Sequence, residues 1–251
     1  HYRLDGQSDD SHWFLYGHRY WSDVKMTVAG GLESNAGAGD AATLASHVHD
    51  LASAAAARMG ATLPLLLGIT AVAVMTRQQL AIAGREMGPE AAPARPVGLR
   101  ASADDVRAAR ARVPRAGVMN LFRSTPVHRI TFDERRTDGY FTAVGRQELT
   151  SGAASDTRPY ELQGRLTHSG PIPTDCRSGT CGTCWVGVLG GADRLSPVEP
   201  NEAKRLRACG YSDPAEPHPL IRLACLAKAS GPVSLVVPPW NGVLGRYARP
   251  V

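Results

Sequence analysis

The first 175 residues of this 251-residue chain contain no cysteine, and all five cysteines follow within the next 50 positions. A disulfide framework needs an oxidising compartment and an even number of cysteines, so this uneven distribution argues against one. The five residues are Cys176, Cys181, Cys184, Cys209 and Cys225.

The N-terminal half also lacks the patterns expected of nucleic-acid, dinucleotide, haem and metal sites. The basic stretch from Gln78 to Leu121 has no aromatic residue to stack on bases, which argues against nucleic acid as a partner. The segment Gly37-Ala-Gly-Asp-Ala-Ala42 formally matches a dinucleotide fingerprint, but no clear strand leads into it, so we do not expect a nucleotide site there. The histidines of the N-terminal region are scattered, and we expect neither haem nor metal on His12, His18, His47 and His49.

Four of the cysteines have an informative spacing. Cys176, Cys181 and Cys184 form a C-x4-C-x2-C run, and Cys225 follows 41 positions after the third. This is the ligand spacing of a plant-type [2Fe–2S] cluster, in which one loop supplies three thiolates. We therefore expect these four residues to be the metal ligands and a [2Fe–2S] cluster to be the cofactor.

The loop between the first three cysteines holds the other candidate site residues. Gly179 and Gly182 lie where a loop around a cluster needs positive φ or a close backbone approach. Arg177 places a positive charge beside the cluster, which favours the reduced form and offers an anchor for an acidic partner. The alternative is that Arg177 pairs with an acid of its own domain.

Other uses of the cysteines fit less well. Zinc sites favour two C-x2-C pairs, and no cysteine or histidine lies within four positions of Cys225. A [4Fe–4S] cluster is typical of C-x2-C-x2-C-x3-C, which is absent. Cys209 precedes a glycine at the end of a helix-like stretch, Glu199–Ala208, and we expect it to pack as a small apolar residue. Cys225 lies in an apolar, β-like run, Leu220–Ala227, that can hold a thiolate rigidly.

The surroundings of the cysteines carry a family resemblance. A candidate strand at Val127–Phe132 and a short helix near Tyr160–Thr167 precede the lead-in His168-Ser-Gly-Pro-Ile-Pro-Thr-Asp-Cys176, and strands are expected at Trp185–Leu189 and Val233–Val237. This order resembles the β-grasp domain of plant-type ferredoxins, which enter the cluster loop through a similar lead-in. The resemblance implies an α+β fold, a [2Fe–2S] cluster and transfer of single electrons.

One departure from that family is the long gap between the third and fourth cysteines. The excess lies between Ser196 and Pro219 and includes a predicted helix from Glu199 to Arg207. Proline is favoured in the first turn of a helix, so the segment fits an ordinary surface helix. A docking element is the alternative interpretation.

A second informative feature is the uncharged run Met59–Thr76, which is just long enough to cross a bilayer as a helix. Residues 1–60 carry four Lys or Arg against seven acidic residues, whereas residues 77–136 carry twelve Arg against six. By the positive-inside rule, the arginine-rich side and the cluster domain then face the cytoplasm of a bacterial inner membrane. The alternative is a buried core helix, since Pro64 and two glycines interrupt the run.

These observations divide the chain into an N-terminal extension (1–58), a transmembrane helix (59–76), an Ala-, Arg- and Pro-rich linker that can touch lipid headgroups (77–120) and a ferredoxin-like domain (121–251). The expected fold is thus an α+β β-grasp domain preceded by a mainly helical or irregular region. No flavin or nicotinamide domain is apparent, so the chain holds no complete catalytic site.

The expected function is electron transfer between redox protein partners, as a subunit of a respiratory or photosynthetic membrane complex. Two alternatives stay open: a tethered ferredoxin that docks freely, and an iron–sulfur redox sensor or structural subunit.

Overall fold

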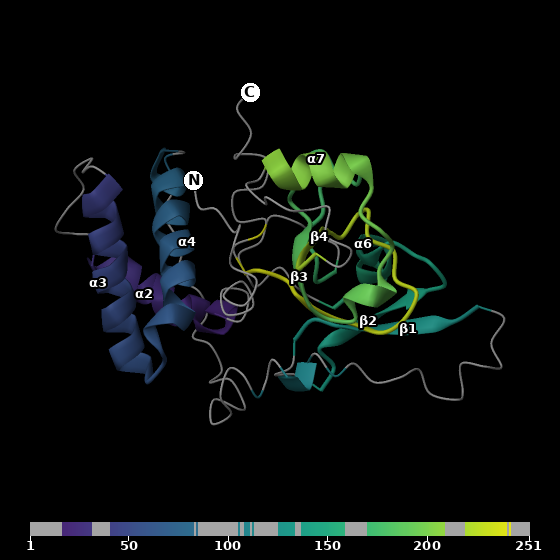
Figure 1. Ribbon diagram of the computed structural model, residues 1–251, viewed down its shortest axis with the longest axis horizontal. Helices are drawn as coiled ribbons and strands as arrows, with labels where there is room; N and C mark the ends of the chain where they lie inside the picture. The colour runs from purple at the N-terminus through teal and green to yellow at the C-terminus, as the bar shows by residue number, and fades with distance from the viewer. Residues whose placement is uncertain are drawn as a thin grey trace. The chain divides into compact units, whose positions relative to one another are not determined.

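A computed structural model describes residues 17–31, 41–82, 84, 105, 108–110, 112, 125–133, 137–158, 170–208, 219–239 and 241. These residues divide into two compact units. The helical unit is drawn from residues 13–96, and the sheet unit is drawn mainly from residues 97–245. Figure 1 shows the helical unit in purple to blue and the sheet unit in teal to yellow.

The described residues of the helical unit form a 3₁₀ turn, η1 (His18–Tyr20), and the α-helices α2 (Trp21–Gly31), α3 (Ala41–Met59) and α4 (Leu63–Ile82). Gly60 ends α3 in the left-handed conformation, with φ of 64°, which glycine adopts without strain. The N–H of Ala61 then donates to the carbonyl of Ala56 (3.1 Å). Pro64 lies in the first turn of α4, where its missing N–H is tolerated. The predicted segment Met59–Thr76 therefore spans this turn, and the apolar helix begins at Leu63 and continues to Ile82.

The three helices pack against one another. The buried residues of α3 are Leu51, Ala52, Ala55 and Ala56, which recur one helical turn apart and form one apolar face. Two arginines tie the neighbouring helices to α2. Arg58 donates to the carbonyl of Asp23 (2.6 Å) and Arg77 to that of Val28 (2.7 Å). Val28 lies in the last turn of α2, so Arg77 satisfies an acceptor that the helix itself leaves open.

Helix α4 is the one described helix that is long and apolar enough to cross a membrane, by length and composition. In its most apolar 18-residue stretch, 56% is buried inside the structure. Leu66 and Ile69 are fully buried, whereas Met75 is 40% exposed and Ile82 is 89% exposed.

The sheet unit is built on five strands in the order β2-β1-β5-β3-β4. Strand β1 pairs antiparallel with β2 and parallel with β5, and β3 pairs antiparallel with both β4 and β5. The strands are β1 (Val127–Thr131), β2 (Tyr140–Val144), β3 (Trp185–Gly190), β4 (Ile221–Leu223) and β5 (Val233–Val236). A mixed sheet of this kind, with helices packed on it, confirms the predicted α+β class and is consistent with a β-grasp arrangement.

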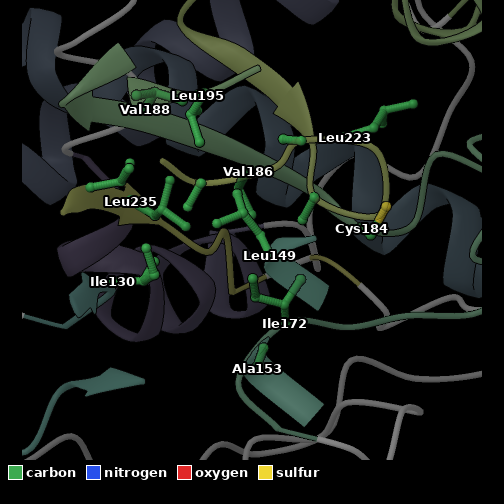
Figure 2. Packing of buried hydrophobic residues seen from close by; sticks show 14 of the residues in the cluster. Ile130, Leu149, Ala153, Ile172, Cys184, Val186, Val188, Leu195, Leu223 and Leu235 are labelled. Carbon is green, nitrogen blue, oxygen red and sulfur yellow. The ribbon is translucent and has the colours of Figure 1, made fainter. Parts of the chain in front are cut away.

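Helix α6 (Leu149–Ala154) packs against β2. A Cβ at Gly152 would lie 2.9 Å from the carbonyl oxygen of Thr142, so only glycine permits this close approach. Figure 2 shows the core that results, with Leu149, Val186 and Leu235 gathered together and the sulfur of Cys184 at the edge of the same cluster. The core of the sheet unit thus extends to the candidate ligands.

Three local predictions differ from the structure or lie outside it. The predicted strand Leu220–Ala227 is only Ile221–Leu223 in the structure. Helix α6 was not predicted, and the helix expected near Tyr160–Thr167 falls outside the described residues, as does Cys209.

Part of the predicted linker is anchored in the sheet unit. Arg110 is buried, with 7% of its surface exposed. Its guanidinium donates to the Ser234 hydroxyl (2.9 Å) and to the carbonyls of Thr131 and Leu235. These groups belong to β1 and β5, the two parallel strands. Arg110, which lies in the predicted linker (77–120), is thus bonded to the sheet, and the compact unit that contains the sheet includes residues 97–245.

Candidate metal centre

The segment that leads into the cysteine loop is fixed by close packing. Gly170 has a φ of 73°, and a Cβ at this position would lie 2.0 Å from the carbonyl oxygen of Ala153 at the end of α6. Ile172 follows and is fully buried. The loop therefore starts from a point held against α6 and the core, which limits where Cys176 can lie.

The loop itself, residues 175–184, has an unusual backbone. Gly179 and Gly182 have φ values of 74° and 79°, as expected from the sequence, and Arg177 has a φ of 54°. Arg177 is the only non-glycine residue with positive φ in the described part of the chain. A Cβ at Gly179 would lie 2.5 Å from the side chain of Leu226, so the loop packs directly on the turn that carries Cys225.

Cys225 lies in that turn, just after β4, and not inside a strand as predicted. The first turn of α6 holds the turn in place: the N–H groups of Leu149 and Thr150 donate to the carbonyls of Ala227 (3.0 Å) and Ala224 (3.2 Å). N–H groups at a helix start have no partner within the helix, so the turn satisfies them while they position it.

The four cysteines are brought together as two pairs. The N–H of Cys181 donates to Sγ of Cys176 (3.3 Å), and the side chains of the same two residues interact. The thiols of Cys184 and Cys225 share a hydrogen bond, and the N–H of Ala224 donates to the carbonyl of Cys184 (3.1 Å).

The two pairs also interact with each other. Cys225 interacts electrostatically with Cys176, and Cys184 with Cys181. Among the described residues, no three His, Cys, Asp or Glu side chains surround a single-ion position. A two-iron cluster does not require such a group, because each iron takes two protein ligands. Two adjacent thiol pairs fit that requirement.

The thiols differ in how readily they ionise. Burial raises the pKa of Cys176, but hydrogen bonds from Thr180, Ser178 and Cys181 outweigh burial and lower that pKa to about 5. The bond that it shares with Cys225, together with burial, raises the pKa of Cys184. The same bond lowers the pKa of Cys225 against the effect of burial, with help from the N–H of Gly179. Each pair therefore contains one thiol whose pKa is lowered, Cys176 or Cys225, and a lowered pKa favours the thiolate, the form that binds metal.

The site is buried on one side and open on the other. Cys184 and Cys225 are 2% and 5% exposed and belong to the core, whereas Cys176 and Cys181 are half-buried. The polar residues between the first two cysteines, Arg177, Ser178 and Thr180, are exposed. This arrangement combines a rigid support with a short distance to the surface, as an electron carrier requires.

Sequence reasoning missed the charged residues that support the Cys225 side. Glu202 of α7 (Pro200–Ala208) and Arg222 of β4 form a fully buried, two-bonded ion pair (2.8 and 3.0 Å). Glu202 also accepts from the N–H of Leu223 (2.8 Å), and Arg222 donates to the carbonyl of Ser196 (2.8 Å). The only hint in the sequence was Arg222, three positions before Cys225. No regular residue spacing indicates that this arginine pairs with an acidic residue of α7. Helix α7 is thus attached to the strand that leads into the fourth cysteine.

The comparisons with known proteins agree with this geometry. Residues 155–230 match the family model of the 2Fe-2S iron-sulfur cluster binding domain, and the match includes all four paired cysteines. No curated protein and no solved structure matches the chain. The C-terminal half of this protein therefore contains a 2Fe-2S iron-sulfur cluster binding domain, whose cofactor is a [2Fe–2S] cluster and whose function is to carry electrons.

Proposed function

We propose that the chain is a membrane-anchored [2Fe–2S] ferredoxin-like protein that serves as an electron-transfer subunit of a membrane redox complex, respiratory or photosynthetic. The observation that carries the anchoring is helix α4, whose 20 residues have the length and composition of a membrane span. The arginine excess after this helix supports a position of the cluster domain on the cytoplasmic side of a bacterial inner membrane.

In this proposal the ligands are Cys176, Cys181, Cys184 and Cys225. The bound cluster supplies one-electron redox chemistry. The chain itself supplies thiolates, N–H donors to sulfur from Cys181 and Thr183, and a core that excludes water from one side. Such hydrogen bonds and burial are the means by which a protein sets the potential of an iron–sulfur centre.

The exposed part of the loop is the proposed meeting point with redox partners. Arg177 is exposed and stands beside the half-buried Cys176, so its charge can attract an acidic partner. Arg177→Ala should then lower the midpoint potential and slow electron transfer more at low salt than at high salt. An unchanged potential together with an unchanged, salt-independent rate would exclude this docking role.

A membrane wash tests the anchor. The full chain should stay in the membrane pellet after a carbonate wash, whereas a fragment beginning at Val97 should be soluble and retain its cluster. The fragment begins at Val97 so that it keeps Arg110, which is bonded to the sheet. If the chain is a permanent subunit, purification in mild detergent should recover it together with the other subunits of the complex in a fixed ratio. A tethered but freely docking ferredoxin would purify alone.

The second candidate function is that of a protein without a membrane anchor, in which α4 is a core helix of the helical unit. This reading is favoured by the 56% burial of its apolar window and by the bond from Arg77 to α2. Release of the full chain by carbonate would support it. The protein would then be a freely docking ferredoxin, or an iron–sulfur sensor whose potential need not match that of any partner.

One substitution separates the two candidates. Met75 lies near the middle of α4 and is 40% exposed. A lysine at the centre of a membrane span costs about 2.5–3.5 kcal/mol, whereas a surface substitution in water changes stability by about 0.5 kcal/mol or less. Met75→Lys should therefore reduce the membrane-bound fraction if α4 spans the bilayer. Gln78→Lys, at an exposed position near the end of α4, is the matched control.

A further inference from the structure

Arg205 of helix α7 reaches the cysteine loop. Nη2 of Arg205 donates to the carbonyl oxygen of Cys181 at 2.7 Å. The arginine is half-buried, and its Nε is buried with no hydrogen-bond partner among the described atoms. A charged donor at the backbone of a ligand is a stronger contact than a neutral one. Arg205 is therefore directed at the cysteine loop and is not a solvated surface charge.

The helix that carries Arg205 is itself fixed. Glu202, three positions earlier on the helix, is completely buried and bonded to Arg222 and to the N–H of Leu223. Leu206, the next residue after Arg205, is 2% exposed and belongs to the core. Because α7 is held at these points, Arg205 presents its guanidinium from a rigid support.

Two hydrogen bonds, one of them from Arg205, restrain the peptide groups on the two sides of Cys181. On one side, the N–H of Cys181 donates to Sγ of Cys176. On the other, the carbonyl of Cys181 accepts from Arg205. Since the peptide unit is planar and trans, a fixed carbonyl also directs the N–H of Gly182 to the opposite side. The loop has no regular secondary structure of its own to supply this restraint.

We propose that Arg205 is a positioning residue of the metal centre. It holds the Cys181 peptide in the conformation that presents the Cys176 and Cys181 thiolates as a pair, and its charge favours the reduced form. The long segment between the third and fourth cysteines then has a role: it supplies the helix from which Arg205 reaches the loop. This inference rests on the cluster domain alone and is independent of membrane anchoring.

Three variants of the full chain, prepared in mild detergent, test the proposal. Arg205→Ala removes the contact and Arg205→Lys keeps one cationic donor. Arg207→Ala is the matched control, because it removes an exposed arginine of the same helix and equal charge. The measurements are the rate of cluster loss to an iron chelator, the midpoint potential and the electron paramagnetic resonance spectrum of the reduced protein.

Arg205→Ala should lose its cluster roughly tenfold faster than the unmodified chain, as is typical when a residue that orients a metal ligand is removed. It should also show a lower midpoint potential and shifted g-values, and Arg205→Lys should restore the loss rate and spectrum in large part. Arg207→Ala should leave the loss rate and the g-values unchanged.

Equal behaviour of Arg205→Ala and Arg207→Ala in all three measurements would overturn the proposal, because charge alone would then explain the result. If Arg205→Ala takes up no cluster, uptake by Arg205→Lys supports the positioning role and its failure overturns it. Absence of a cluster in the unmodified chain would instead contradict the cluster domain itself, so the two failures are distinguishable.

Discussion

The helical unit and the sheet unit build their interiors from different chemistry. The buried face of α3 consists of Leu51 and three alanines, and Arg58 links α3 to α2 through a backbone carbonyl and the Thr27 hydroxyl. The core of the sheet unit contains two thiols, Cys184 and Cys225, and adjoins a fully buried ion pair. Small apolar side chains are interchangeable, whereas a thiolate or a paired carboxylate is not. In the sheet unit, the identity of particular residues therefore indicates function. In the helical unit, only the hydropathy of a segment does so.

The largest effect is expected from the cysteines, where this contrast is sharpest. Cys225→Ser should abolish or strongly perturb the S = 1/2 signal of the reduced protein and lower its iron and sulfide content, because one of four thiolate ligands is lost. Cys209→Ser should leave both unchanged. The reverse outcome would show that the assignment of the fourth ligand is wrong.

The next effect concerns the buried ion pair. Glu202→Gln should lower the free energy of unfolding by about 3–5 kcal/mol, since Arg222 would keep a buried charge without its partner. The control is Lys228→Ala, which breaks the half-exposed pair with Glu148 (3.7 Å) and should cost about 1 kcal/mol or less. Denaturant midpoints monitored by circular dichroism measure both. Equal effects would mean that the buried pair contributes no more than a surface pair.

A substitution in the helical unit tests whether the two units are independent. Leu66→Ala should destabilise the helical unit by about 2–5 kcal/mol, because Leu66 is completely buried in α4. Ile82→Ala, at a position that is 89% exposed, should have almost no effect. Limited proteolysis reports the stability of the helical unit, and the cluster signal reports that of the sheet unit. A changed cluster signal in Leu66→Ala would contradict their independence.

The smallest expected effect is a dependence of stability on pH. His128 of β1 is 6% exposed, and burial lowers its pKa below the ordinary value of 6.5, although a hydrogen bond to the backbone of Gly145 opposes this. As the pH falls below 6.5, the unfolded chain binds a proton that the folded domain does not, so stability falls until the lowered pKa is reached. His128→Leu should flatten this decline. Melting temperatures of both proteins between pH 5.5 and 8 measure the difference, and parallel curves would exclude His128 as its source.

Much of the sheet unit was predictable because its signals are local. The candidate strand Val127–Phe132 and the apolar run Trp185–Leu189 predicted β1 and β3 nearly to their ends. The structure places the fourth cysteine beside the others, where it interacts with Cys184 and Cys176, but its position in a turn was not predicted. The apolar run Leu220–Ala227 continues through that turn because the turn, too, is buried. Hydropathy records burial and does not distinguish a strand from a buried turn.

The charged residues around the site were not predictable for a different reason. Glu202, Arg205, Arg110 and Arg222 each act on a group at least twenty positions away. In the sequence they resemble solvated surface charges, which most arginines and glutamates are. Only the packing of α7 on β4, and of the segment before β1 on the sheet, removes them from water and gives them partners.

The sequence by itself determined the chemistry of this protein: the spacing of four cysteines and the lead-in to their loop, because ligand spacing must match the dimensions of a cluster that one short loop can surround. It also determined that α4 is long and apolar. The tertiary structure decided which peptide groups direct the thiols, where the domain begins and what supports the loop from behind. Those features depend on contacts between segments distant in the chain, and such contacts leave no periodicity or spacing in the sequence.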